Sequence, residues 1–239
     1  MERYRKVRRV FINDYAVLPF ILCTIALVMA YWLTRFVNYT FRGTIDTFYN
    51  ITTKYDNMID PIPWWTVVYF GCYIVWIVSF LWVSKQGKDI SNRMLFSDML
   101  CKLLCTAIFI IYPTTMSRPG VPEDAFASPL LELLYMIDSP DNLFPSMHCT
   151  ASWFAARYPM RCSAIPKWYK AIAWVSLFLV FASVLYTKQH VIADIFGGVI
   201  AAEACIQLSE RTKLYRLFNK LDLGIILENK NERKQNTGN

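Results

Sequence analysis

Residues 64–84 read WWTVVYFGCYIVWIVSFLWVS and include no Asp, Glu, Lys or Arg. A helix needs about 20 apolar residues to cross the roughly 30 Å hydrocarbon core of a bilayer, so this stretch predicts a membrane-spanning helix. Similar apolar blocks recur along the chain. The predicted helices are 15–37, 64–84, 94–114, 145–159, 168–187 and 190–209. The sequence therefore predicts an all-α, polytopic membrane protein whose six transmembrane helices form one bundle.

Length and composition leave little room for anything else. The chain has 239 residues, of which 55% are hydrophobic and 16% aromatic. Six spans of about 20 residues with their loops use almost all of it. We expect a basic N-terminal segment (1–14), one six-helix domain (15–209) and a basic tail (210–239). The end of the tail, 228–239, has no apolar face to bury and is predicted to be disordered.

The distribution of Lys and Arg predicts the orientation in the membrane. Basic residues gather before the first helix and in 85–93, 157–170 and 211–220, whereas 38–63, 115–144 and 187–190 contain few. The positive-inside rule then places both termini in the cytoplasm and the poorer loops on the extracytoplasmic face. Because the basic residues flank apolar blocks instead of forming one stripe, the net charge of +7 predicts no nucleic-acid partner.

The cysteines predict neither a disulfide framework nor a metal site. There are seven, an odd number, and most fall inside apolar blocks, where Cys behaves as a small hydrophobic residue. They form no CxxC pair or Cys/His cluster at the spacing of metal ligands. We therefore expect no metal and no cofactor.

The chain contains only two histidines, and each falls at the predicted outer end of a helix. His148 ends the segment 142–148, NLFPSMH, in which Pro145 suits the first turn of a helix. The unpaired N–H groups of such a turn, with the Ser146 hydroxyl as a further donor, favour binding of a phosphate. The alternative is an ordinary helix start.

The second histidine has an acidic partner one helical turn away. His190 precedes Asp194 by four residues, a spacing that permits a hydrogen bond between them. A carboxylate that accepts the proton of one ring nitrogen fixes the tautomer and makes the other nitrogen a better nucleophile or base. The alternative is a structural His–Asp link, but ionisable groups at a span's end are costly and indicate function.

Three motifs in this order resemble the type 2 phosphatidic acid phosphatase superfamily, over residues 111–198. The motifs are Arg118-Pro119, Pro145-Ser146-Met147-His148, and Ser183 with His190 and Asp194. The resemblance implies six helices and an outward-facing, metal-free site. It implies that His190 attacks phosphorus to form a phosphohistidine, that Asp194 orients it, and that His148 protonates the leaving alkoxide. Arg118 and the helix start with Ser146 and Met147 would bind the phosphate oxygens.

The chain also departs from the family's motifs. Ile111 and Val184 stand where the family has Lys and Arg, and Met147 stands where it has Gly. Lys188 would replace one lost charge, or would extend to the membrane interface as an ordinary basic residue. These departures resemble the branch of inositol phosphorylceramide and sphingomyelin synthases, in which an alcohol takes the place of water as acceptor.

The sequence thus predicts a membrane lipid phosphatase that hydrolyses a lipid phosphate or pyrophosphate, with lipid substrates and membrane lipids as its partners. The alternatives are a phosphoalcohol transferase and a catalytically inactive lipid-binding protein. The sequence does not indicate the oligomeric state. We further expect Asp98 and Lys102, with Glu203 at similar depth, to form an ion pair or triad that ties the third and sixth helices together, in preference to a transport pathway.

Overall fold

Apolar helices make up most of the chain in the computed structural model, which describes residues 12–123 and 126–228. The principal helices are α2 (Asp14–Val28), α3 (Thr34–Arg42), α5 (Trp65–Ser84), α6 (Lys88–Ile111), α8 (Met147–Arg157), α9 (Lys167–Tyr186) and α10 (Ile192–Thr212). A π-helical segment, η1 (Met29–Leu33), joins α2 to α3 without a break, and we call α2, η1 and α3 together the first helix. The basic residues before position 12 and the predicted disordered end after 228 lie outside the described residues.

Five of these helices are long and apolar enough to cross a membrane. They are the first helix (Asp14–Arg42), α5, α6, α9 and α10. The predicted span 145–159 forms α8, which has only 11 residues and a length of about 16 Å, half of what a span requires. Its apolar side chains are buried by neighbouring helices, and burial in protein gives the same sequence pattern as burial in lipid. The structure therefore shows a helical membrane protein with five spans of full length.

The surface of the bundle is typical of a protein in lipid. Large apolar side chains are exposed along the first helix, α5 and α10, for example Trp32 (71%), Ile74 (67%) and Ile200 (67%). Exposed apolar surface on this scale is rare on soluble proteins, whereas hydrocarbon solvates it well. These faces are where we expect lipid.

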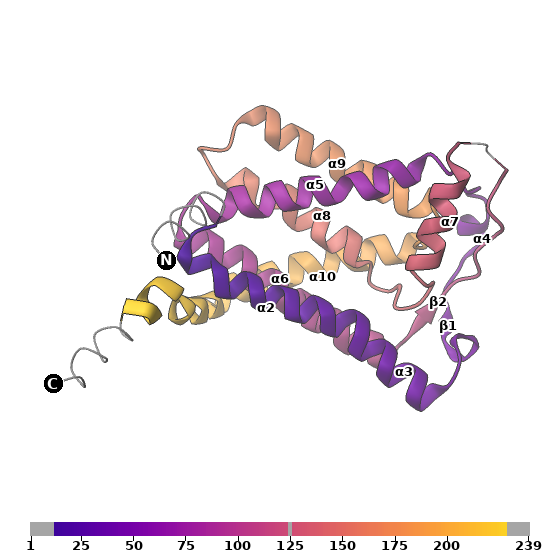
Figure 1. Ribbon diagram of the computed structural model, residues 1–239, viewed down its shortest axis with the longest axis horizontal. Helices are drawn as coiled ribbons and strands as arrows, with labels where there is room; N and C mark the ends of the chain where they lie inside the picture. The colour runs from indigo at the N-terminus through magenta and orange to yellow at the C-terminus, as the bar shows by residue number, and fades with distance from the viewer. Residues whose placement is uncertain (1–11, 124–125, 229–239) are drawn as a thin grey trace.

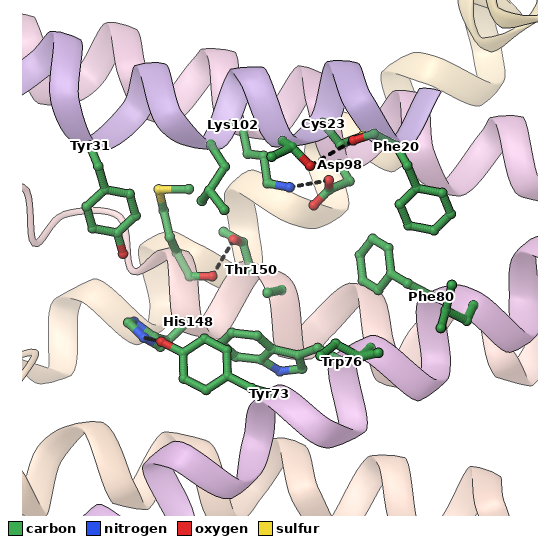
Figure 2. A pocket seen from close by; sticks show the side chains of 16 residues that line it. Phe20, Cys23, Tyr31, Tyr73, Trp76, Phe80, Asp98, Lys102, His148 and Thr150 are labelled. Carbon is green, nitrogen blue, oxygen red and sulfur yellow. Dashed lines mark hydrogen bonds and ion pairs between the residues drawn. The ribbon is translucent and has the colours of Figure 1, made fainter. Parts of the chain in front are cut away.

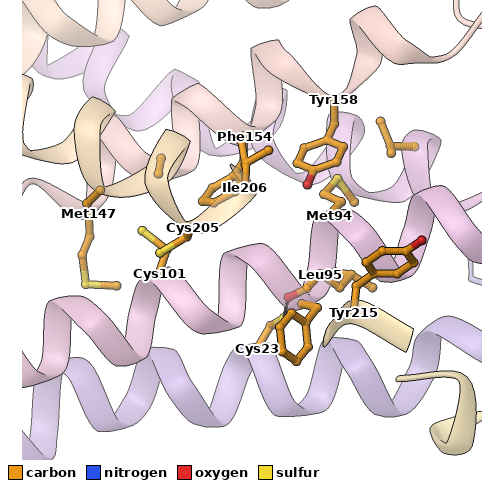
Figure 3. Packing of buried hydrophobic residues seen from close by; sticks show 14 of the residues in the cluster. Cys23, Met94, Leu95, Cys101, Met147, Phe154, Tyr158, Cys205, Ile206 and Tyr215 are labelled. Atoms are coloured by element: carbon orange, nitrogen blue, oxygen red, sulfur yellow. Dashed lines mark hydrogen bonds between the residues drawn. The ribbon is translucent and has the colours of Figure 1, made fainter. Parts of the chain in front are cut away.

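Helix packing places α8 near the centre. The first helix packs on α6, α6 on α10, α10 on α8, and α8 and α5 on α9. Figure 3 shows part of the core between these helices, including Met94, Leu95, Phe154 and Ile206, all of which are fully buried. A short helix surrounded by long ones leaves its first turn inside the bundle.

The loops gather at one end of the bundle, which we call the site end (Figure 1). Its short elements are η2 (Ile45–Thr47), β1 (Tyr49–Asn50), α4 (Lys54–Asn57), β2 (Thr114–Thr115) and α7 (Ser128–Ile137). β1 and β2 pair in parallel, with Tyr49 opposite Thr114, so the loop after the first helix joins the loop after α6.

The opposite end is closed by two 3-10 helices, η3 (Pro159–Arg161) and η4 (Leu214–Leu221). Residues 214–221 belong to the predicted tail, yet they fold back on the bundle and bury Tyr215 and Phe218. Phe218 meets Phe96 of α6 edge to face at 5.2 Å. The sequence placed these residues in the tail and did not predict that they pack on the bundle.

The expected charged triad is only partly present. Lys102 donates to Asp98 at 2.5 Å, as predicted. Glu203 instead accepts hydrogen bonds from Trp153 and Gln207 and lies 3.7 Å from Arg157. Glu203 therefore links α10 to α8, and the Asp98–Lys102 pair stays within α6.

Candidate active site

The loop between α9 and α10 forms a tight turn that fixes the position of His190. Lys188 adopts a left-handed conformation with φ of 51°, and the N–H groups of Gln189 and His190 both donate to the carbonyl of Val184. Asp194, fully buried in the first turn of α10, accepts from His190 Nδ1 at 3.2 Å and from the Val191 N–H at 2.9 Å. Pairing at Nδ1 leaves Nε2 as the free nitrogen of an oriented ring.

The first turn of α8 is fastened to the same place. The Ser146 N–H donates to the Asp194 carbonyl at 3.1 Å. The helix begins at Met147, one residue beyond Ser146, whose hydroxyl accepts the Cys149 N–H as an N-cap. Ser146 was predicted as a phosphate donor; the structure shows that its oxygen caps the helix.

Close approach of α10 to α8 depends on Gly198. A Cβ atom at this position would lie 2.7 Å from the Ser146 carbonyl oxygen and 3.0 Å from Cys149 Cβ. Because the first of these is backbone, a side chain would push the start of α8 away from α10. Sequence reasoning missed this glycine, since a single Gly inside an apolar helix gives no sign of what it faces.

His148 lies on the other side of this contact, among aromatic rings. Tyr73 Oη is 3.2 Å from His148 Nε2, and the rings of Tyr69 and Trp76 lie 4.5 and 5.7 Å from the imidazole centroid. His148 Nδ1 is buried and has no hydrogen-bond partner. The imidazoles of His148 and His190 are 5.7 Å apart between centroids. The fold thus brings together two histidines from different segments, as the sequence predicted.

Both histidines line one small cavity of about 10 Å³, enough for a single water. Met147 and Gln189 also contribute, together with the carboxylates of Asp138 and Asp141. A phosphoryl group is larger than this space. Binding one requires side chains around the histidines to move.

A larger apolar groove of about 440 Å³ begins at His148 and runs between the first helix and α5 (Figure 2). Figure 2 shows Tyr31 and Phe20 on one wall, and Tyr73, Trp76 and His148 on the other. Its lining spans from Tyr31 to Phe20 on the first helix, a depth of about 16 Å, close to one leaflet of hydrocarbon. We call it the histidine groove.

Tyr31 links the groove to the small cavity because it lines both. It belongs to the π-helical segment η1. Such segments change the direction in which side chains leave a helix and are frequent at functional sites. Sequence reasoning did not single out Tyr31, because an inserted π turn has no clear signal in an apolar block.

Two predicted phosphate-binding cations donate their hydrogen bonds to the protein itself. Arg118 donates to the carbonyls of Lys188 and Asp138 and to the Gln189 side chain, at 2.6 to 3.0 Å. Lys188 Nζ donates to the Asp56 carbonyl at 2.8 Å. Burial lowers the pKa of Lys188, although nearby acidic groups oppose this. Both cations line a separate polar cleft of about 310 Å³, which shares no lining residue with the histidine cavity.

Asp56 is a residue that sequence reasoning missed. Its carboxylate accepts the Ile192 N–H at 2.7 Å, so the loop after the first helix holds the start of α10. Burial alone would raise the pKa of Asp56, but hydrogen bonds from Thr53 and Ile192 lower it below its usual value. The motif Thr53-x-x-Asp56, a capping box, was a readable signal of local structure and gave no hint of this long-range contact.

Arg35 is a further cation beside the histidine cavity. Its Nε donates to Asp141, a cavity residue, at 2.9 Å, and its Nη2 lies 3.8 Å from Asp138. Nη2 is buried and has no hydrogen-bond partner. Burial raises the pKa of Asp141, and Arg35 acts against this rise. Arg35 also lines a pocket of about 280 Å³ with Tyr31 and Tyr73.

Among the described residues, no group of three or more His, Cys, Asp or Glu side chains is arranged to hold a metal ion. All seven cysteines are free and buried. Metal-free chemistry stays a prediction from the sequence. No family model, curated protein or solved structure matches this chain.

Proposed function

We propose that this protein is a membrane lipid phosphatase that acts through a phosphohistidine. One observation carries the proposal: an Asp-oriented histidine and a second histidine from a different segment, 5.7 Å apart, line one cavity at the head of a lipid-sized groove. A nucleophile oriented by a third group, with an acid opposite, is what phosphoryl transfer to a side chain requires.

The reaction proceeds in two steps. His190 Nε2 forms a bond to phosphorus, the bond from phosphorus to the lipid oxygen breaks, and His148 gives its proton to that oxygen. Water then attacks phosphorus, gives a proton to His148 and releases phosphate as the N–P bond breaks. The Tyr73 hydroxyl keeps the His148 ring in place throughout.

Water is the acceptor in this proposal, because hydrolysis needs no second organic substrate at the site. A transferase would also need room for an alcohol beside the phosphohistidine. The cleft lined by Asp56, Asp60, Arg118 and Lys188 shares no residue with the histidine cavity, whereas the pocket lined by Arg35 shares Tyr31 and Asp138 with it. Transfer to an alcohol is the second candidate and the inactive binding protein the third.

Arg35 supplies the positive charge that the motifs lack, through Nη2, which has no hydrogen-bond partner and lies 3.8 Å from Asp138. We expect Arg35→Gln to raise KM about tenfold, the effect of one charge-assisted hydrogen bond, and Arg35→Lys to recover part of it. Arg42→Gln is the control, because Arg42 donates to the Ile110 and Ile111 carbonyls and lines none of the cavities described. An unchanged KM in Arg35→Gln would remove Arg35 from the site.

The decisive experiment measures phosphate release by purified protein from a panel of lipid phosphates and pyrophosphates, with and without added alcohols. His190→Ala should abolish turnover, and Asp194→Asn should lower it about 100-fold or more. Asp222→Asn, which alters a carboxylate paired with Lys88 at the opposite end, is the matched control. An alcohol-dependent phospholipid product would identify a transferase, and lipid binding without any turnover would identify the inactive alternative.

We also propose that both termini are cytoplasmic and that the site end faces the extracytoplasmic side, on the basis of the Lys and Arg distribution. Because the native cysteines are buried, single cysteines can report the orientation. An impermeant maleimide added to intact cells should label Thr44→Cys, at the site end, and spare Arg211→Cys. The reverse pattern would invert the topology.

A further inference from the structure

The histidine groove contains one pair of formal charges in a largely apolar wall. Asp98 and Lys102 lie one turn apart on α6, and Lys102 Nζ donates to Asp98 Oδ2 at 2.5 Å. Their side chains are only 4% and 16% exposed, yet both line the groove. Figure 2 shows them pointing into the space between the first helix and α5. An ion pair facing hydrocarbon is costly and calls for an explanation.

The ammonium has hydrogen-bonding capacity that the protein does not use. It carries three N–H groups, and among the described residues Asp98 alone accepts from it. The nearby hydroxyls of Thr24 and Thr150 donate to backbone carbonyls of their own helices. Two of its three N–H groups therefore have no acceptor among the described residues, and Lys102 lines the groove.

The depth of Lys102 follows from two contacts between the first helix and α6. Cys23 Sγ bonds to the Leu95 carbonyl, 72 residues further along, and Asn38 Nδ2 to the Phe109 carbonyl, 71 residues further. This nearly constant offset means that the two helices run in parallel. The Cα atom of Lys102 is therefore level with residues 30 and 31 of the first helix.

Residue 31 is the tyrosine that lines the cavity containing His148 and His190. Lys102 lines the groove but not the histidine cavity, and its side chain reaches back one turn, toward Asp98, so its ammonium lies about 5 Å below the level of its own Cα atom, on the groove side of the histidines. In an acylated lipid phosphate, the ester or amide carbonyls follow directly below the headgroup, where the chains begin. A prenyl phosphate has only hydrocarbon at that depth.

We propose that Lys102, held by Asp98, is a second binding point for the substrate and donates a hydrogen bond to the ester or amide carbonyl of an acylated lipid phosphate. The inference rests on the proposed function and narrows it, because it selects acylated lipids over prenyl phosphates. Asp98 holds the ammonium in place when no lipid is bound.

The test compares two substrates of equal chain length, a diacyl lipid phosphate and its dialkyl ether analogue, which lacks the carbonyls. Wild-type protein should prefer the diacyl lipid about tenfold in kcat/KM, the effect of one hydrogen bond to a charged group. The double variant Asp98→Asn/Lys102→Met removes both charges, so that neither is left buried without its partner. This variant should treat the two lipids equally.

Lys88→Met/Asp222→Asn is the matched control, because it removes another Lys–Asp pair, at 2.8 Å, at the opposite end of the bundle. It should keep the preference. Binding of the two lipids to His190→Ala protein, measured by displacement of a fluorescent lipid phosphate, separates this inference from the proposed function. Preferential binding of the diacyl lipid without turnover in wild type would support the inference and refute the phosphatase. Equal binding and equal kcat/KM in wild type, or a preference that survives in the double variant, would overturn the inference.

Discussion

Two apolar grooves of nearly equal volume flank α5, and only one of them contains polar chemistry. The histidine groove, on the side of the first helix, has about 440 Å³ and includes His148, Asp98 and Lys102. The groove between α5 and α9 has about 450 Å³ and is lined by residues such as Gly71 and Ala171, with no charged side chain or histidine. A seam between membrane helices is therefore not by itself a sign of function. Function is indicated where the seam reaches ionisable groups.

The contact between α8 and α10, behind the histidine groove, differs from both grooves in its packing. There the first turn of α8 is pressed against α10 through Gly198, without space for another atom. A tightly packed contact between α8 and α10 thus positions His148. The proposed lipid site is the loosely packed groove between the first helix and α5. Catalytic geometry tolerates little displacement, whereas an acyl chain only needs room.

The largest effect should come from Gly198→Ala. The added methyl group must displace the Ser146 carbonyl and with it His148, so we expect phosphate release to fall about 100-fold and the free energy of unfolding to fall by about 1–3 kcal/mol. Gly71→Ala is the control, since a Cβ there meets nothing within 4 Å and should keep full activity. Turnover assays and thermal unfolding in detergent measure both effects. A fully active Gly198→Ala protein would show that α8 can shift without harm.

A smaller effect is expected from filling the two grooves. Ala151→Leu places a larger side chain in the histidine groove and so reduces its free volume. Ala171→Leu does the same in the groove between α5 and α9. The first should raise KM for a long-chain lipid phosphate about tenfold, roughly the loss of two buried methylene groups, without changing KM for a short-chain ester. The second should change neither value. If Ala171→Leu alone raised KM, substrate would enter through the α5–α9 groove.

The smallest effect concerns the loop that closes the site end. The pKa of Asp56 is lowered in the folded protein, so its contribution to stability is complete above the usual carboxyl pKa of about 4 and is lost as pH falls toward the lowered value. We expect Asp56→Asn to lower the free energy of unfolding by about 1–2 kcal/mol at pH 7. The difference from wild type should shrink below about pH 4.

Thermal unfolding at several pH values measures this difference. Asp46→Asn, in the same loop but exposed, should leave the unfolding temperature unchanged throughout. An Asp56→Asn effect of the same size at pH 3.5 and pH 7 would show that Asp56 acts through shape and not through its charge.

The amino-acid sequence was sufficient for the membrane-length helices, because the length and apolarity of a span are properties of consecutive residues. It was also sufficient to pair His190 with Asp194, although α10 begins only at Ile192 and Asp194, in its first turn, reaches back to His190 and to the Val191 N–H. The sequence placed His148 in the same site as His190 and Asp194 only through the family resemblance, which rests on the order of the motifs. It failed on α8, whose apolar residues face other helices and not lipid.

Contacts between distant segments were decided by the tertiary structure alone. Arg118 and Lys188 have the residue types expected of phosphate ligands, but the fold directs them to backbone carbonyls. Tyr31 lines the histidine cavity, and Arg35 contacts the cavity residues Asp138 and Asp141, only because the first helix packs at this point. Gly198 matters because of the carbonyl opposite it. The sequence determined which residues are ionisable, apolar or helical; only packing decided which of them share a cavity, because that depends on surfaces far apart along the chain.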